Sequence, residues 1–130
     1  AASSDYPLRD VYKRQMLSDT VGVADPQTIE YLFSTLIPAL PQLEIGVHLH
    51  TAPHNWKEKI EAAYNNGCRR FDSVIKGYGG CPMAKDDLIG NMPTENLLNY
   101  FSREQLGPQF NIRAIEDSLR EANLVFPAQQ

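Results

Sequence analysis

Apolar side chains recur between residues 26 and 40 at the spacing of one helical face. The repeat follows the i, i+3, i+4, i+7 pattern of an amphipathic helix and comprises Ile29, Leu32, Phe33, Leu36, Ile37 and Leu40. Asp25 is suited to cap the free N–H groups of the first turn, and Pro26 fits the first helical position. Because proline bends or ends a helix, Pro38 and then Pro41 are expected to terminate this one.

Alternating apolar residues between positions 43 and 49 predict a β-strand. Leu43, Ile45, Val47 and Leu49 occupy every second position, and side chains two apart share one face of a strand. Short segments near 15–19 and 70–74 are interpreted as further strands. A helix over residues 55–66 separates the last two strands, with Gly67 as its C-terminal cap. Its inner face consists of Trp56, Ile60, Ala63 and Tyr64.

Two more helices are predicted in the C-terminal third of the chain. Thr94 is expected to cap the first, which carries Leu97, Leu98 and Phe101. Asn111 is expected to cap the second, with an inner face of Ile112, Ile115, Leu119 and Ala122. Short strands alternating with helices of this length predict an α/β fold with about three parallel, adjacent strands and helices packed on one side.

The composition of the 130-residue chain fits one soluble domain, with 42% hydrophobic and 22% charged residues. A net charge of −4 provides no basic field for nucleic acid or anionic lipid. No apolar run approaches the roughly 18 residues of a membrane span. No secretory signal is evident, and two cysteines, Cys68 and Cys81, are too few for a disulfide scaffold. A reduced, cytoplasmic setting is therefore expected.

The two ends of the chain differ from the rest. Residues 1–15 show neither helical nor strand periodicity, and residues 10–15 look like translated adapter sequence. We interpret residues 1–15 as a non-native segment, or else a genuine disordered tail, and assign them no chemistry. Residues 126–130 are expected to be frayed, which leaves 16–125 as the folded domain.

Polar residues cluster where the predicted strands end, which is the edge at which α/β barrels build their active sites. His48 and His50 lie two apart, on the parity opposite to the apolar residues, and could bind one divalent cation together. The alternative is a polar strand face with no ligand. His54 is a weaker candidate, and Asn91 could add an amide oxygen or simply serve as a turn or cap residue beside Gly90.

A glycine-rich loop precedes one of the two cysteines. Its glycines, Gly77, Gly79 and Gly80, are followed directly by Cys81 and Pro82. Glycine allows backbone conformations that other residues avoid, so a thiol on such a loop could move into and out of a pocket. The alternative is a surface loop with an incidental cysteine.

Four motifs together resemble the 3-hydroxy-3-methylglutaryl-CoA lyase family, in its order and close to its spacing, over about residues 16–125. They are Ser18-Asp19-Thr20-Val21-Gly22, Val47-His48-Leu49-His50, Gly79-Gly80-Cys81-Pro82 and Gly90-Asn91. The His-x-His motif alone is shared with isopropylmalate and homocitrate synthases, whereas the Gly-Gly-Cys-Pro loop is specific to the lyase branch.

The resemblance implies cleavage of a 3-hydroxy-3-methylglutaryl thioester into acetyl-CoA and acetoacetate, with Mg²⁺ or Mn²⁺ as cofactor. It implies that His48, His50 and Asn91 are metal ligands and that Cys81 and Asp19 are catalytic-site residues. Cys81 would assist proton transfer, and Asp19 would line the site as a polar residue. The implied partner is an acyl-CoA thioester, and the parent enzyme could be a homodimer.

Departures from the family pattern leave the substrate open. Thr51-Ala52-Pro53-His54 stands where the family has Asp-Thr-Tyr-Gly, and the segment from Cys81 to Asn91 is one residue longer than usual. The first-strand Asp-Arg-Glu motif, with its metal-binding aspartate, does not occur here. A full (β/α)8 TIM barrel needs about 250 residues, so the chain is expected to be the C-terminal half of one.

Three readings follow from these observations. The first is a fragment of a hydroxymethylglutaryl-CoA lyase-like enzyme, inactive on its own. The second is part of a condensing enzyme of the isopropylmalate or homocitrate synthase type, and the third is a non-catalytic metal-binding module. A half-barrel is also expected to expose apolar faces that the missing half would cover, including Ile45, Val47 and the inner side of the 29–40 helix.

Overall fold

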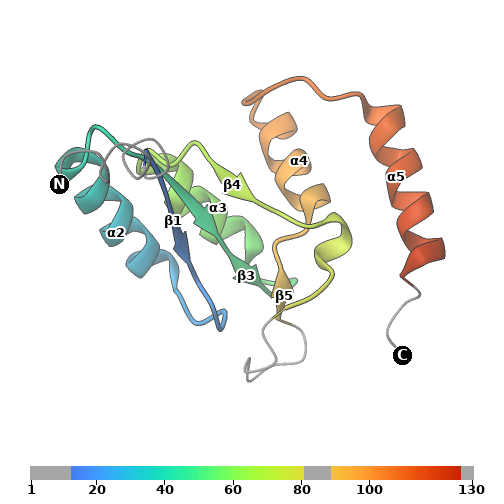
Figure 1. Cartoon of the computed structure of the whole chain (residues 1–130), viewed down its shortest axis with the longest axis horizontal. Helices are drawn as coiled ribbons and strands as arrows, with labels where there is room; N and C mark the ends of the chain where they lie inside the picture. The colour runs from blue at the N-terminus through green and yellow to red at the C-terminus, as the bar shows by residue number, and fades with distance from the viewer. Residues whose placement is uncertain (1–12, 81–88, 127–130) are drawn as a thin grey trace, which may run out of the picture.

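A three-stranded parallel sheet forms the centre of the protein (Figure 1). The computed structural model describes residues 13–80 and 89–126. The strands are β1 (Arg14–Ser18), β2 (Glu44–His48) and β4 (Phe71–Asp72), in the order β1-β2-β4. Both pairings are parallel, with Leu17 opposite Val47 and His48 opposite Asp72. The prediction of three adjacent parallel strands is therefore confirmed.

A second, two-stranded sheet continues from the end of β2. It consists of β3 (His50–Thr51) and β5 (Gly90–Asn91), which pair antiparallel with His50 opposite Asn91. The backbone N–H of Met92 donates to the carbonyl of Leu49 at 3.0 Å, which joins the second sheet to the end of the first. The sequence pattern did not predict this sheet, because two-residue strands have no detectable period.

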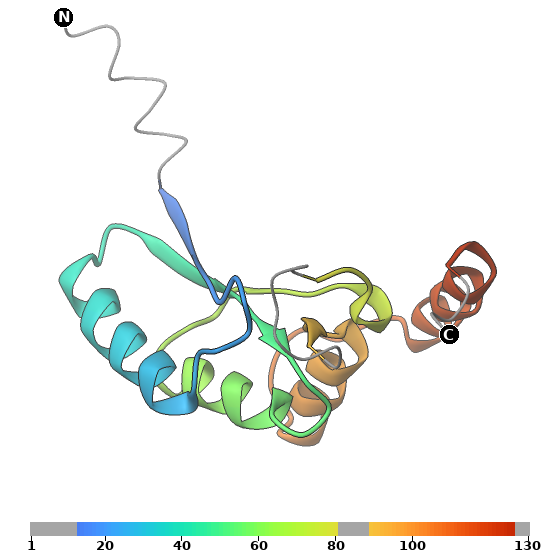
Figure 2. The same cartoon turned by 90° about the horizontal axis from the view of Figure 1, so that it is seen from below.

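Helices α2 (Pro26–Ala39), α3 (Trp56–Asn65) and α4 (Thr94–Arg103) lie on one side of the strands (Figure 2). A short 3-10 turn, η1 (Ile75–Gly77), precedes the glycine loop, and the last helix, α5 (Ile112–Val125), packs against this turn. No helix in the described part of the chain combines the length and the apolar character that crossing a membrane requires.

The ends of the helices largely follow the predicted caps. The Asp25 side chain accepts a hydrogen bond from the Thr28 N–H at 2.7 Å, and Asn111 caps Ala114 in the same way at 3.1 Å. Thr94 is not a cap. It is the first residue of α4, and its hydroxyl lies 2.9 Å from that of Ser73.

Gly67 terminates α3 through its left-handed backbone. Its φ of +98° is unfavourable for residues with a side chain and allows two hydrogen bonds that close the helix. The N–H of Gly67 donates to the Tyr64 carbonyl at 3.1 Å, and the N–H of Cys68 donates to the Ala63 carbonyl at 3.0 Å. This pair of bonds is a Schellman motif, which turns the chain toward β4.

The hydrophobic core lies between the sheet and its helices. Ile45 and Val47 are 5% and 3% exposed, and Ile29 and Phe33 on the inner face of α2 are 3% and 1% exposed. The expectation that these faces would be exposed is therefore wrong, because the chain's own helices cover them. The opposite face of the sheet is more polar and carries an ion pair between Arg14 and Glu44 at 2.9 Å.

The folded part extends slightly beyond the predicted limits. Arg14 and Gln15 pair with Glu44 and Ile45, so they belong to β1 although the sequence placed them in the excluded segment. At the other end, the ring of Phe126 lies 5.1 Å from that of Tyr78, and Tyr78 Oη donates to the Phe126 carbonyl at 2.9 Å. Residues 1–12 and 127–130 lie outside the described residues.

Replacing the most buried aromatic residue of α2 should destabilise the fold strongly. Phe33→Ala is expected to lower the free energy of unfolding by about 3–5 kcal/mol, because it leaves a cavity in the core. The matched control is Tyr31→Ala, since Tyr31 lies in the same helix and is 67% exposed. Urea unfolding followed by circular dichroism measures both variants. Equal losses would contradict the assignment of this face to the core.

Candidate metal centre

The structure brings together three polar side chains from the ends of three strands, β2, β3 and β5. His48 closes β2 and His50 opens β3, and their ring centroids lie 5.2 Å apart at an interplanar angle of 64°. Asn91 is the direct antiparallel partner of His50, a position from which side chains interact across strands. The three predicted metal ligands therefore meet at the carboxyl end of the parallel sheet.

The His50 ring is held by the backbone of the loop after β1. Its Nδ1 lies 2.8 Å from the carbonyl oxygen of Asp19, and His50 is buried. Because a carbonyl oxygen only accepts hydrogen bonds, Nδ1 carries the proton in this contact. In neutral imidazole the other nitrogen, Nε2, then keeps the lone pair that a metal ion needs.

A carboxylate from the neighbouring strand contacts the His48 ring. Nδ1 of His48 lies 3.6 Å from Oδ2 of Asp72, and both side chains are partly exposed. An acidic partner on one ring nitrogen orients an imidazole and leaves the other nitrogen for a ligand. The sequence analysis did not single out Asp72. The signal was its position within the strand predicted near 70–74, although only the structure shows that the strand ends at Asp72.

The amide of Asn91 is oriented by the glycine loop. Its Nδ2 donates to the Tyr78 carbonyl at 2.8 Å, so among the described residues the amide oxygen is the atom left as a candidate ligand. The loop approaches closely because Gly77 has no side chain: a Cβ there would lie 2.7 Å from the Asn91 carbonyl oxygen, and φ is +66°. Glycine at this position is therefore part of how Asn91 is held.

Asp19 lies behind His50 in a buried ion pair. Its Oδ2 is 2.8 Å from Lys59 Nζ, and its Oδ1 accepts from the Ala24 N–H at 3.1 Å. The side chains of Asp19 and Lys59 are 4% and 2% exposed. The sequence analysis did not identify Lys59, although its spacing of three residues from Trp56 and four from Ala63 puts it on the inner face of α3.

The remaining candidates fall into different environments. Cys81 lies outside the described residues, and His54 is exposed in the turn before α3. Cys68 is buried, and burial raises the pKa of its thiol to about 11. Cys68 is therefore a small buried hydrophobe of low reactivity.

The donor set suits a divalent cation. Two imidazole nitrogens and one amide oxygen form a mixed N/O set without the thiolates typical of structural zinc sites. Within residues 13–80 and 89–126, no group of three His, Cys, Asp or Glu side chains is placed to hold a metal. Asn91 is therefore the third candidate ligand among these residues, and a charge-balancing carboxylate would have to come from elsewhere.

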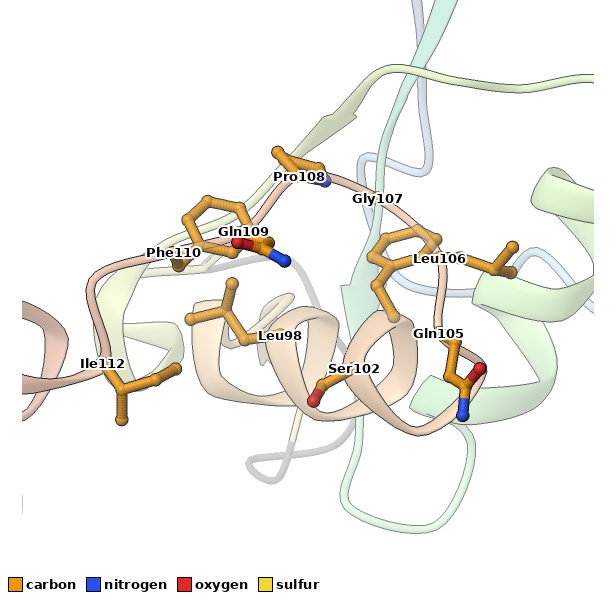
Figure 3. Close-up of a pocket in the computed structure, with 10 residues that line it drawn as sticks. Leu98, Ser102, Gln105, Leu106, Gly107, Pro108, Gln109, Phe110 and Ile112 are labelled. Atoms are coloured by element: carbon orange, nitrogen blue, oxygen red, sulfur yellow. The ribbon is translucent and has the colours of Figure 1, made fainter.

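Two cavities differ in their relation to this centre. One of about 440 Å³ lies between α4 and the connection to α5, away from the histidines (Figure 3). A second, of about 330 Å³, adjoins the metal centre through Asn91. Its other lining residues include Thr51, Trp56, Lys76, Pro93 and Asn96. The second cavity provides space beside the candidate ligands.

Comparisons with known proteins agree with the motifs and the geometry. The HMGL-like family matches residues 12–121. The chain is 33% identical over 87 residues to the (R)-citramalyl-CoA lyase of Chloroflexus aurantiacus, covering 67% of this chain and 27% of that protein. It is 34% identical over 82 residues to the cytoplasmic 3-hydroxy-3-methylglutaryl-CoA lyase of Rattus norvegicus, covering 63% of this chain and 24% of that one.

A solved structure shows the same fold. It is an HMG-CoA lyase from Acinetobacter baumannii in complex with coenzyme A and 3-methylmalate. It superposes with a TM-score of 0.75 at 26% identity, covering 95% of this chain and 40% of the solved one. The predicted fold, an α/β partial TIM barrel, is thereby confirmed.

The match is to one part of longer proteins. The aligned region spans about a quarter of each of the two lyases and two fifths of the solved chain. The family match over residues 12–121 spans the four motifs and the three-stranded parallel sheet. The chain therefore belongs to the HMGL-like family, in which the resemblance to the 3-hydroxy-3-methylglutaryl-CoA lyases had placed it.

Proposed function

We propose that the chain is the C-terminal half of a barrel enzyme that cleaves a carbon–carbon bond in a 3-hydroxy-acyl-CoA. The favoured reaction splits a 3-hydroxy-3-methylglutaryl thioester into acetyl-CoA and acetoacetate. The observation that carries this proposal is the convergence of His48, His50 and Asn91, with His50 Nε2 and the Asn91 amide oxygen left for a ligand. Two relatives named as acyl-CoA lyases and a related lyase solved with coenzyme A support this class of substrate.

His48, His50 and Asn91 would hold Mg²⁺ or Mn²⁺. When bound, such an ion supplies Lewis-acid stabilisation of the alkoxide that forms from the substrate's tertiary hydroxyl. Asp72 would orient the His48 ring through the 3.6 Å contact between Oδ2 and Nδ1, and the Asp19 carbonyl would hold the proton on His50 Nδ1. Cys81 would deliver a proton to the departing acetyl-CoA enolate, since a thiol held in a pocket can act as a general acid.

The wider setting belongs to the same proposal. The barrel segment would run to residue 125, and the segments before β1 and after α5 would carry no chemistry. The parent enzyme would be a cytoplasmic carbon–carbon lyase that could form a homodimer. It would act on an acyl-CoA thioester rather than on nucleic acid or a membrane. A related lyase is named as cytoplasmic, which supports this location.

A condensing enzyme of the isopropylmalate or homocitrate synthase type is the alternative reaction. It would use the same His-x-His pair in the direction of bond formation. Acetyl-CoA consumption with a 2-oxo acid, assayed beside acetoacetate release, separates the two in a full-length parent. A non-catalytic metal-binding module would show neither activity while still binding the ion.

Loss of either histidine should abolish the metal site. In a full-length parent, His48→Ala and His50→Ala are each expected to weaken Mn²⁺ binding by ~10–100-fold or more. Loss of a group that only orients a ligand costs that much, so loss of the ligand itself should cost at least as much. Turnover should fall with binding. His54→Ala is the matched control, because His54 is exposed in the following turn. Calorimetry that finds unchanged Mn²⁺ affinity in both variants would remove these residues from the site.

The two cysteines should differ in reactivity. Cys81 is expected to react with a thiol reagent at pH 8 well before Cys68, whose thiol is buried with its pKa raised to about 11. Mass spectrometry of Cys68→Ala and Cys81→Ala assigns each rate. In a full-length parent, Cys81→Ala should lose turnover and keep the metal. Faster labelling of Cys68 would reverse the assignment.

The 130-residue chain should have no lyase activity by itself. It lacks the first-strand Asp-Arg-Glu motif, and within residues 13–80 and 89–126 no further strand of the three-stranded sheet pairs with the outer edges of β1 and β4. Acetoacetate release is measured with Mn²⁺ and hydroxymethylglutaryl-CoA, against a full-length relative as positive control. Turnover clearly above buffer would show that the missing groups are supplied in another way.

A further inference from the structure

We infer that Lys59 is a positioning residue for the metal centre, and that it holds His50 in place through Asp19 and through the His50 backbone. This inference rests on the proposed function, because it gives Lys59 a role toward the same ligand set. Lys59 lies in α3 and does not itself point its charge at the proposed cation. Its ammonium instead reaches the loop after β1 and the strand end that carries His50.

Every donor of the Lys59 ammonium has an acceptor. Nζ lies 2.8 Å from Asp19 Oδ2, 3.0 Å from the His50 carbonyl and 3.2 Å from the Gly22 carbonyl. An ammonium has three donors, so this set satisfies all of them. A lysine with a 2% exposed side chain is costly to bury unless it is paired in this way. The ammonium thus links Asp19, Gly22 and His50 through three hydrogen bonds.

The link acts on His50 from two directions. Lys59 donates a hydrogen bond directly to the His50 carbonyl. It also holds the Asp19 carboxylate, and the Asp19 backbone carbonyl accepts a hydrogen bond from His50 Nδ1. Removing the ammonium would release the Asp19 carboxylate and the His50 backbone together. The imidazole would then no longer be confined to the tautomer that leaves Nε2 free for a metal ion.

The same contacts give Asp19 a specific role. Both of its carboxylate oxygens are already paired, with Lys59 and with the Ala24 N–H, and its side chain is 4% exposed. Its carboxylate is therefore directed to Lys59 and the Ala24 N–H, and in this inference Asp19 acts on the centre through His50. Asp19 and Lys59 together connect α3 to His50, so the position of the helix determines where the His50 ring lies.

A purely structural role for Lys59 makes a different prediction. A buried ion pair that only contributes to folding would affect stability and leave the His50 tautomer and metal affinity unchanged in any variant that folds. The two roles are therefore separated by observing the imidazole itself. The chain has three histidines, so its imidazole nitrogen spectrum is simple to assign.

The experiment uses the full 130-residue chain, labelled with ¹⁵N and free of metal, and three variants. Lys59→Met removes the ammonium. Asp19→Asn/Lys59→Met removes both charges and therefore leaves no unpaired charge buried. The double variant carries the test if the single variant fails to fold. Lys57→Met is the matched control, because Lys57 lies in the same helix, is 60% exposed and, among the described residues, pairs only with Glu61 across one turn. Long-range ¹H–¹⁵N spectra report the tautomers, and Mn²⁺ titration by electron paramagnetic resonance reports affinity.

The wild-type chain and Lys57→Met should show His50 protonated at Nδ1. Lys59→Met and the double variant should lose this tautomer and bind Mn²⁺ ~10–100-fold more weakly, the range for loss of a group that orients a ligand. A wild-type His50 protonated at Nε2 would overturn the inference without any variant. So would a folded double variant with the wild-type tautomer and an Mn²⁺ affinity within about twofold of wild type, a negligible difference in binding free energy.

Failure of the proposed function has its own signature. A wild-type chain that does not bind Mn²⁺ would contradict the proposed metal centre in this chain. The response of the His50 spectrum to Lys59→Met would still decide whether Lys59 positions the ring, because that measurement is made without metal.

Discussion

The two-residue period of β2 is the constraint on which the rest of the structure depends. Ile45 and Val47 face α2 and α3 and are almost fully buried, which fixes the orientation of the strand between β1 and β4. A shift of one residue would expose this apolar set, so the register is strongly specified. The same register puts His48 on the opposite parity, beside Asp72 of the neighbouring strand. Core packing therefore determines where the candidate ligands point.

Parallel pairing has a second consequence, since it brings all strand ends to one edge. Asp19 follows β1, His48 ends β2, and Asp72 ends β4. These residues are distant in the sequence, yet each contributes a carbonyl, an imidazole or a carboxylate at this edge. The short antiparallel pair of β3 and β5 then adds Asn91 opposite His50. The site is thus assembled by the topology of the sheet, and the long-range antiparallel contact between β3 and β5 places the last candidate ligand.

A buried ion pair fixes the geometry of this edge in a way that an apolar core could not. Asp19 and Lys59 are both nearly inaccessible to solvent, and each is fully hydrogen-bonded. Replacing such a pair by apolar residues is often neutral for stability, so stability alone does not account for its presence. What the pair provides is a defined geometry, because it connects a helix to two strand ends through directional bonds.

The sequence by itself determined the order of elements and most of their limits. Periodicity suffices for this, since a period of two or of 3.6 is a local property, as residues 43–49 and 26–40 illustrate. The candidate ligands were named from the His-x-His spacing and the family resemblance. Only the tertiary structure decided which groups support those ligands. Lys59 and Asp19 are 40 residues apart, and the helical spacing that puts Lys59 on the inner face of α3 does not indicate which carboxylate it reaches. The two-residue strands β3 and β5 escaped prediction for the same reason: their pairing is long-range, and their sequences are too short to carry a period.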